Sequence, residues 1–223
     1  MYIFLVLFFA CWGSFCACYM HRFIHKEDIL LERSHCPNCK QTLTWWQLIP
    51  IVSYISLQGK CYYCKQKISL YYLLHEIMHI LLCFLLSLFL DNYLMILIVG
   101  IYISINYMLA YIDYKTQLVP TSLLIILFLL VISIQPPTLL SIYNAFFYLI
   151  TLSLLYIIKK DQLGYGDVLY ISIQSLLLPI TYTSIAILIA CLLAIMYCIK
   201  KRNSKIPFLP FLVIGFLLLL FIS

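Results

Sequence analysis

Residues 70–90 read LYYLLHEIMHILLCFLLSLFL, an apolar stretch long enough to cross a bilayer as a single helix. Its main polar feature is the sequence His-Glu-Ile-Met-His at residues 75–79. Two histidines four residues apart on a helix can bind zinc while the glutamate between them acts as a base. The stretch therefore predicts a membrane helix and raises the hypothesis of an intramembrane zinc metalloprotease using His75, Glu76 and His79.

The whole chain has the composition of an integral membrane protein. Of its 223 residues, 65% are hydrophobic and 10% are charged, far outside the range of a soluble domain. We expect an all-α polytopic membrane protein in a lipid bilayer, with residues 1–20 as the first transmembrane helix, 21–69 as a small loop domain and 70–223 as the remaining membrane helices. Apolar runs indicate about eight transmembrane helices, near residues 1–20, 70–90, 93–112, 117–135, 139–158, 166–180, 181–199 and 206–222.

The basic residues predict the orientation, because Lys and Arg gather in cytoplasmic loops. In the eight-helix topology, all 14 of them fall on one side of the membrane: Arg22, Lys26, Arg33, Lys40, Lys60, Lys65, Lys67, Lys115, Lys159, Lys160, Lys200, Lys201, Arg202 and Lys205. We expect a multi-pass protein with the 21–69 loop facing the cytoplasm. The net charge of +6 is explained by this topology, so no nucleic-acid partner is expected.

The loop contains two motifs in which two cysteines are separated by two residues (Cys-x-x-Cys), namely Cys-Pro-Asn-Cys at 36–39 and Cys-Tyr-Tyr-Cys at 61–64. Each motif can offer two thiolates, and two motifs complete a tetrahedral site of the structural kind. The alternative is a pair of disulfides, but cytoplasmic thiols stay reduced. A loop of this size also has too small a core to fold unaided. We therefore predict that zinc staples the loop through Cys36, Cys39, Cys61 and Cys64.

Two aspartates border the predicted membrane helices at one depth and on one side. Asp113 lies at the cytoplasmic end of the third helix, and Asp167 lies at the cytoplasmic start of the sixth, in the sequence Gly164-Tyr-Gly166-Asp167. Two carboxyl groups held close together share a proton, so one can activate water while the other polarises a peptide carbonyl. This pattern predicts aspartic protease chemistry at the cytoplasmic boundary.

The glycines before Asp167 fit this interpretation, because glycine permits unusual backbone angles and lets another chain come close. Each aspartate also has a simpler interpretation. Asp167 can be a helix N-cap after a glycine turn, and Asp113 a solvated charge at a helix end. The two residues together favour the catalytic interpretation.

The ordered motifs closely resemble those of the type IV prepilin peptidases, bacterial membrane aspartic proteases. The matching segments are GSF at 13–15 with Arg22, RSHCPNC at 33–39, LIPIVSYISLQGKCYYC at 48–64, ISLYYLLHE at 68–76, the two aspartate motifs, and IPFLPF at 206–211. By resemblance, Asp113 and Asp167 are the catalytic residues and the four loop cysteines bind metal. Arg22 and Glu76 match family positions and are assigned a supporting role.

The resemblance also implies the biology. The substrate would be a prepilin or pseudopilin whose short basic leader is cut on the cytoplasmic side of the bacterial cytoplasmic (inner) membrane. Many members also methylate the new N-terminus with S-adenosylmethionine. Here Ala17 replaces a common asparagine and Leu169 a common lysine. The short chain resembles the enzymes of competence pilus systems.

Two rival functions are weighed against this one. The metalloprotease needs a third zinc ligand besides His75 and His79, and no downstream motif clearly supplies one. A membrane transporter would explain acidic residues in membrane helices, but it explains neither the cysteine motifs nor two aspartates at one depth. The sequence thus favours the aspartic peptidase.

Overall fold

A computed structural model of the chain describes residues 2–29, 33–159, 164–201 and 206–220. Within these ranges the secondary structure is helical, apart from two isolated antiparallel bridges in the loop. The chain divides into two compact units, Met1–Gly100 and Ile101–Ser223. The basic residues Lys160, Arg202 and Lys205, which helped to predict the topology, lie outside the described residues.

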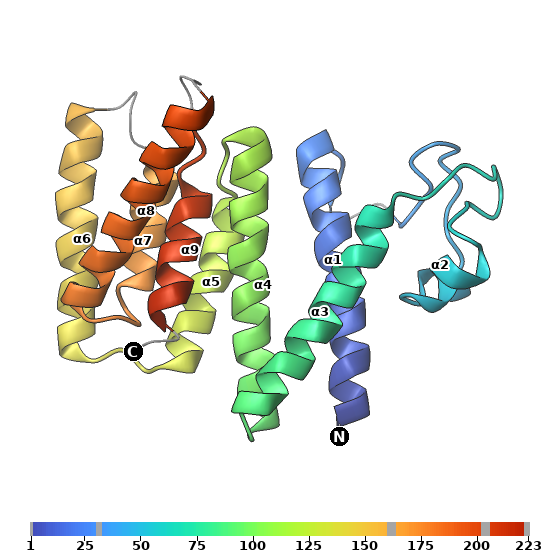
Figure 1. Cartoon of the computed structure of the whole chain (residues 1–223), viewed down its shortest axis with the longest axis horizontal. Helices are drawn as coiled ribbons and strands as arrows, with labels where there is room; N and C mark the ends of the chain where they lie inside the picture. Colours follow the sequence, from blue (N-terminus) through green and yellow to red (C-terminus); the bar gives the residue numbers. More distant parts are fainter. Residues whose placement is uncertain (1, 30–32, 160–163, 202–205, 221–223) are drawn as a thin grey trace. The chain divides into compact units, whose positions relative to one another are not determined.

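The first unit is built on a pair of membrane helices that pack side by side, α1 and α3 (Figure 1). Gly13 of α1 permits this packing, since a Cβ there would lie 2.8 Å from the carbonyl oxygen of His75 and 3.0 Å from the ring of His79. The elements of this unit are α1 (Tyr2–His25), the 3-10 helix η1 (Trp45–Leu48), α2 (Val52–Ser56), α3 (Leu70–Phe89) and the first part of α4 (Tyr93–Thr116).

In the part of the second unit that the structure describes, the rest of α4 is followed by five further helices. The short helix α7 packs against α5, α6 and α9 (Figure 1), and its residues Val168, Tyr170 and Ile171 are buried. Gly215 lets α9 approach α8, because a Cβ there would lie 2.5 Å from the carbonyl oxygen of Ala186. The further helices are α5 (Thr121–Ile134), α6 (Leu139–Ile158), α7 (Tyr165–Gln174), α8 (Ile180–Lys201) and α9 (Leu209–Leu220).

Within the described residues, five helices are long and apolar enough to cross a membrane: α1, α3, α4, α6 and α8. Helices α5 and α9 are apolar but shorter, and α7 has only 10 residues. The predicted all-α, multi-span fold is confirmed, whereas the number of eight spans stays a prediction.

Candidate active site and metal centre

Asp113 forms a hydrogen bond with the start of α9, a helix that follows much later in the chain. It lies one turn before the end of α4, is 6% exposed, and its Oδ2 accepts a hydrogen bond of 3.2 Å from the backbone N–H of Leu209. Leu209 is the first residue of α9, where backbone N–H groups have no acceptor within the helix. Asp113 therefore caps α9, which gives the IPFLPF segment at 206–211 a structural role that the sequence did not reveal.

Asp167 lies in the first turn of α7 and is 8% exposed. Its backbone N–H donates to the carbonyl oxygen of the N-cap residue Gly164 at 3.1 Å. Its carboxyl group folds back over that residue, because a Cβ on Gly164 would lie 3.0 Å from Oδ2 of Asp167. Gly164 has an ordinary φ of −77°, so space for the carboxyl group, and not an unusual backbone angle, is what this glycine provides.

Gly166 lies against the chain that leaves α4. A Cβ on Gly166 would lie 2.6 Å from the Cβ of Val119, in the connection that follows α4 and precedes α5. This distance is far below van der Waals contact, so only glycine fits without a rearrangement. The two aspartate motifs are thus in contact where Gly166 packs against the side chain of Val119.

The carboxyl groups of Asp113 and Asp167 interact electrostatically. Both are buried in apolar helices of one unit, where an uncompensated charge is costly and usually functional. The structure therefore brings together four of the predicted site residues, namely Asp113, Gly164, Gly166 and Asp167. Such a pair can hold one proton between two carboxyl groups.

A buried polar network joins the same two helices, and it was not predicted. Tyr102 donates to Oε1 of Gln174 at 2.6 Å, and Tyr170 donates to Oδ1 of Asn106 at 2.6 Å. Nε2 of Gln174 donates to the same Asn106 oxygen at 2.8 Å. All four side chains are at most 1% exposed. The signal in the sequence is the presence of uncharged polar residues within apolar helices, which stands out less than an ionisable residue does.

The four predicted metal ligands lie together in the first unit. The sulfur atoms of Cys36, Cys39, Cys61 and Cys64 are all within 4.8 Å of one another, and those of Cys36 and Cys64 are 3.9 Å apart. A tetrahedral zinc with sulfur bonds of about 2.3 Å separates its ligands by about 3.8 Å. The site therefore fits a metal ion held by four thiolates.

Each Cys-x-x-Cys motif forms the same small turn. Cys36 donates its backbone N–H to the carbonyl of Gln41 at 3.0 Å, and Cys61 donates to that of Gln66 at 2.8 Å. The residue after each motif has a positive φ, 57° at Lys40 and 58° at Lys65. Antiparallel bridges close the two turns, His35 with Thr42 and Lys60 with Lys67. The metal site is thus built from two matching halves.

Backbone N–H groups in these turns also point at the ligand sulfurs. The N–H of Gln66 is the main cause that lowers the pKa of the Cys64 thiol to about 6. At Cys39 the bond from Gln41 acts in the same direction, but burial and the three neighbouring thiols outweigh it and raise the pKa to about 11. Four clustered thiols therefore resist full deprotonation, and a cation that stabilises their thiolates suits the site.

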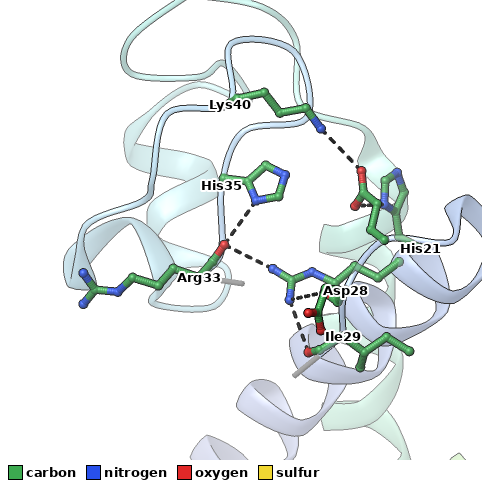
Figure 2. Close-up of polar contacts among 8 residues, drawn as sticks. His21, Asp28, Ile29, Arg33, His35 and Lys40 are labelled. Atoms are coloured by element: carbon green, nitrogen blue, oxygen red, sulfur yellow. Dashed lines mark hydrogen bonds and ion pairs between the residues drawn. The ribbon is translucent and has the colours of Figure 1, made fainter. Parts of the chain in front are cut away.

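Arg22 anchors the start of the loop on the end of α1. Its side chain is 7% exposed and donates to the backbone carbonyls of Asp28 at 3.3 Å, Ile29 at 3.3 Å and Arg33 at 3.2 Å. Lys40 reaches Glu27 at 3.4 Å beside it, and these contacts are drawn in Figure 2. Arg22 therefore ties Asp28, Ile29 and Arg33 to the end of α1.

Glu76 anchors the other side of the loop on α3. Its carboxylate is 7% exposed and accepts the backbone N–H of Ile51 at 2.7 Å. Ile51 has φ 61° and ψ −52°, and Val52 N–H donates back to the Pro50 carbonyl at 2.6 Å. This is a γ-turn with a positive φ at a β-branched residue, a strained conformation. Glu76 thus braces a strained turn of the loop.

The two histidines beside Glu76 are buried at the contact between α1 and α3. Nδ1 of His79 lies 2.7 Å from the carbonyl oxygen of His75. Among the described residues, the four loop cysteines are the only group of three or more metal-ligating side chains that lie close enough to hold an ion. The described part of the chain therefore gives these histidines no third ligand.

The architecture defines a polytopic membrane protein with a cysteine-rich metal site in a loop and a buried pair of carboxyl groups. The sequence of the chain matches two family models in succession. The Bacterial Peptidase A24 N-terminal domain matches residues 7–90, and the Type IV leader peptidase family matches residues 98–199.

Full-length relatives agree with these matches. The chain is 30% identical to a prepilin leader peptidase/N-methyltransferase of Legionella pneumophila, over 88% of this chain and 74% of the relative. It is 31% identical to one of Stutzerimonas stutzeri, over 84% and 71%, and 26% identical to one of Vibrio cholerae, over 99% and 97%. No solved structure matches the chain significantly. The chain belongs to the type IV leader peptidase family, the prepilin peptidases.

Proposed function

We propose that this chain cleaves the leader peptide of type IV prepilins or pseudopilins as an aspartic endopeptidase, with Asp113 and Asp167 as the catalytic pair. The observation that carries this proposal is the convergence of two buried, electrostatically interacting carboxyl groups at the end of α4 and the start of α7. The family match supports the peptidase activity.

The chemistry follows from one proton shared by two carboxyl groups. The ionised member takes a proton from a water molecule, whose oxygen attacks the peptide carbonyl, while the protonated member gives its proton to the carbonyl oxygen. The tetrahedral intermediate collapses when the leaving nitrogen takes back a proton and the C–N bond breaks. The N–H of Leu209, at 3.2 Å from Oδ2 of Asp113, stabilises negative charge there, so we assign Asp113 as the ionised member.

We place the active site and the metal loop on the cytoplasmic side of the bacterial inner membrane. The distribution of basic residues supports this orientation. A leader that is itself basic would lie on the same side before cleavage, so substrate and site would meet without transfer of charged residues across the bilayer.

We assign zinc to the four-cysteine site. Four thiolates in tetrahedral spacing match zinc better than magnesium or calcium, which prefer oxygen ligands. The metal would cross-link the two halves of the loop and has no reacting atom to activate, because all its positions are taken by sulfur. Its role in the proposal is structural.

Methyl transfer is the second activity in the relatives' printed names. A pocket of the second unit, between α5, α6 and α7, is lined by apolar side chains such as Phe128, Phe146 and Leu169, with Ser172 as its polar residue. Such a lining does not fit the charged sulfonium and carboxylate groups of S-adenosylmethionine. We derive no methyl-transfer step from this pocket.

Co-expression with a prepilin, followed by mass measurement of the pilin N-terminus, tests the proposal. Asp113→Asn and Asp167→Asn should each abolish cleavage, because an amide cannot share the proton. Asp91→Asn, which changes an exposed aspartate, is the matched control and should process normally. Substantial cleavage by either of the first two variants would exclude the aspartic mechanism. The same mass spectrum reports whether the new N-terminus is methylated.

A further inference from the structure

On each of the helices α4 and α7, one residue of the buried polar network lies seven residues from the aspartate of that helix. Asn106 precedes Asp113 by seven residues on α4, and Gln174 follows Asp167 by seven residues on α7. Seven residues make almost two full turns of helix, so the members of each pair lie on one face, about 10 Å apart along the axis. The network and the acids therefore occupy the same face of each helix.

The hydrogen bonds also set the direction and register of the two helices. Tyr102 pairs with Gln174, and Asn106 pairs with Tyr170, so residue numbers rise on α4 as they fall on α7. The helices run antiparallel along this contact. Gln174 also donates to Asn106, so these two residues lie opposite each other. Seven residues further along α4 is Asp113, and seven residues back along α7 is Asp167. Because the helices are antiparallel, both steps lead in the same direction in space.

The network is fully buried and internally satisfied. Nδ2 of Asn106 donates to the Tyr102 carbonyl at 2.9 Å, and Nε2 of Gln174 also donates to the Tyr170 hydroxyl at 3.0 Å. Apolar side chains at these positions would fill the space without any need for partners. A polar network fixes one arrangement instead, because a slip of one helix along the other would leave several buried groups unpaired.

We propose that Tyr102, Asn106, Tyr170 and Gln174 are positioning residues that lock the register of α4 against α7 and so keep the carboxyl groups of Asp113 and Asp167 opposite each other. This inference rests on the proposed aspartic mechanism. It assigns the network to the reaction, through the geometry of the acid pair, and not only to the stability of the fold.

The test compares hydroxyl deletions in equivalent surroundings. Tyr170→Phe removes a hydroxyl from the network. Tyr148→Phe is its matched control, because Tyr148 is 6% exposed and its hydroxyl bonds the Ile180 carbonyl at 3.1 Å and Ser184 at 2.7 Å, joining α6 to α8. Both variants are purified in detergent, the folded fraction is measured, and cleavage of a prepilin is followed per folded molecule.

We expect Tyr170→Phe to lower kcat by about ten- to a hundred-fold with little change in KM, because misplacement by about 1 Å is enough for such losses. Tyr148→Phe should change kcat less than two- to three-fold. The pH profile of kcat supplies a second readout, because a loss of stability alone would not shift its limbs. Two close carboxyl groups titrate in steps that their repulsion drives apart, so the limbs of the bell-shaped profile should move toward each other in Tyr170→Phe and not in the control.

The proposal is overturned if Tyr170→Phe matches the control in kcat and leaves both limbs in place. If Tyr170→Phe does not fold, Tyr102→Phe decides in its stead, because it removes only the hydroxyl at the end of the network, and the same two readouts apply. Failure of the aspartic mechanism itself would appear differently, as cleavage that survives Asp113→Asn or Asp167→Asn.

Discussion

The carboxylate of Glu76 on α3 accepts the backbone N–H of Ile51, at 2.7 Å, in the strained turn of the metal loop. Loss of this acceptor leaves the partly buried N–H of Ile51 unpaired, so Glu76→Ala should lower the free energy of unfolding of the loop by about 1–3 kcal/mol. Glu76→Gln keeps an accepting oxygen and should lose less. Hydrogen exchange of the Ile51 amide in detergent measures the effect.

Glu27→Ala is the control for Glu76→Ala, because the ion pair of Glu27 with Lys40 lies nearer the surface and should contribute little. Ile51→Gly provides a complementary test, since glycine adopts the positive φ at lower cost and should slow local opening when Glu76 is absent. Equal exchange rates in Glu76→Ala and the parent protein would contradict the bracing role.

Gly166 and Gly164 should differ in their tolerance of a methyl group. Gly166→Ala places a Cβ 2.6 Å from that of Val119, which overpacks the contact and should destabilise the protein by about 1–3 kcal/mol. Gly164→Ala meets the end of the Asp167 side chain at 3.0 Å, which can move. Thermal unfolding in detergent ranks the two variants, and Val119→Gly should partly rescue Gly166→Ala. No rescue would show that the close contact is not the cause.

Elemental analysis of the purified protein should find about one zinc per chain, the amount that one four-thiolate site holds. Replacement of Cys36 and Cys61 by serine removes one ligand from each half of the site and should abolish binding. Cys11→Ser changes an exposed cysteine outside the cluster and should leave the metal in place. A parent protein without metal would remove the zinc assignment but would leave the peptidase mechanism untouched.

Trypsin offers a direct test of orientation, because it cuts only after Lys and Arg. All 14 of these residues are predicted on the cytoplasmic side. Sealed inside-out membrane vesicles should therefore yield fragments cut between residues 22 and 67, whereas sealed right-side-out vesicles should leave the chain whole. Opening both preparations with detergent should give identical fragments. Any cut in sealed right-side-out vesicles would refute the topology.

The histidine variants test the metalloprotease hypothesis. His75→Ala combined with His79→Ala should leave prepilin cleavage per folded molecule largely intact. Nε2 of His79 is buried and has no hydrogen-bond partner in the described residues, and Nδ1 lies 2.7 Å from the His75 carbonyl of the same helix. The substitutions therefore remove this bond and leave space against Gly13, but they do not change either acid of the proposed catalytic pair. Complete loss of cleavage, measured by the mass of the pilin N-terminus, would restore the zinc-protease interpretation.

The sequence predicted the parts of the site whose chemistry shows in local spacing. The Cys-x-x-Cys motifs needed only two pairs of thiols, and they lie together as expected. Asp113 and Asp167 stood out because charges are rare in apolar helices, and they interact as expected. Their catalytic roles stay a prediction.

The remaining features depend on how the helices are rotated about their axes. Most of the membrane helices have apolar side chains on all their faces, so the pattern of hydrophobicity does not show which face packs against a neighbouring helix. The pairing of Asn106 with Tyr170, the cap of Asp113 on Leu209 and the contact of Gly13 with α3 follow from that rotation. The strained turn at Ile51 could not be predicted either, since isoleucine is among the residues least suited to it.

The cap on α9 has a consequence for biosynthesis. Leu209 follows Asp113 by 96 residues, so the ribosome delivers the acid long before the N–H that completes its surroundings. Until α9 has joined its neighbours, the carboxylate of Asp113 lacks this donor, and α9 lacks its cap. Assembly of α9 and completion of the acid's environment are therefore one event, which makes the maturation of the acid wait for the synthesis of a segment 96 residues downstream.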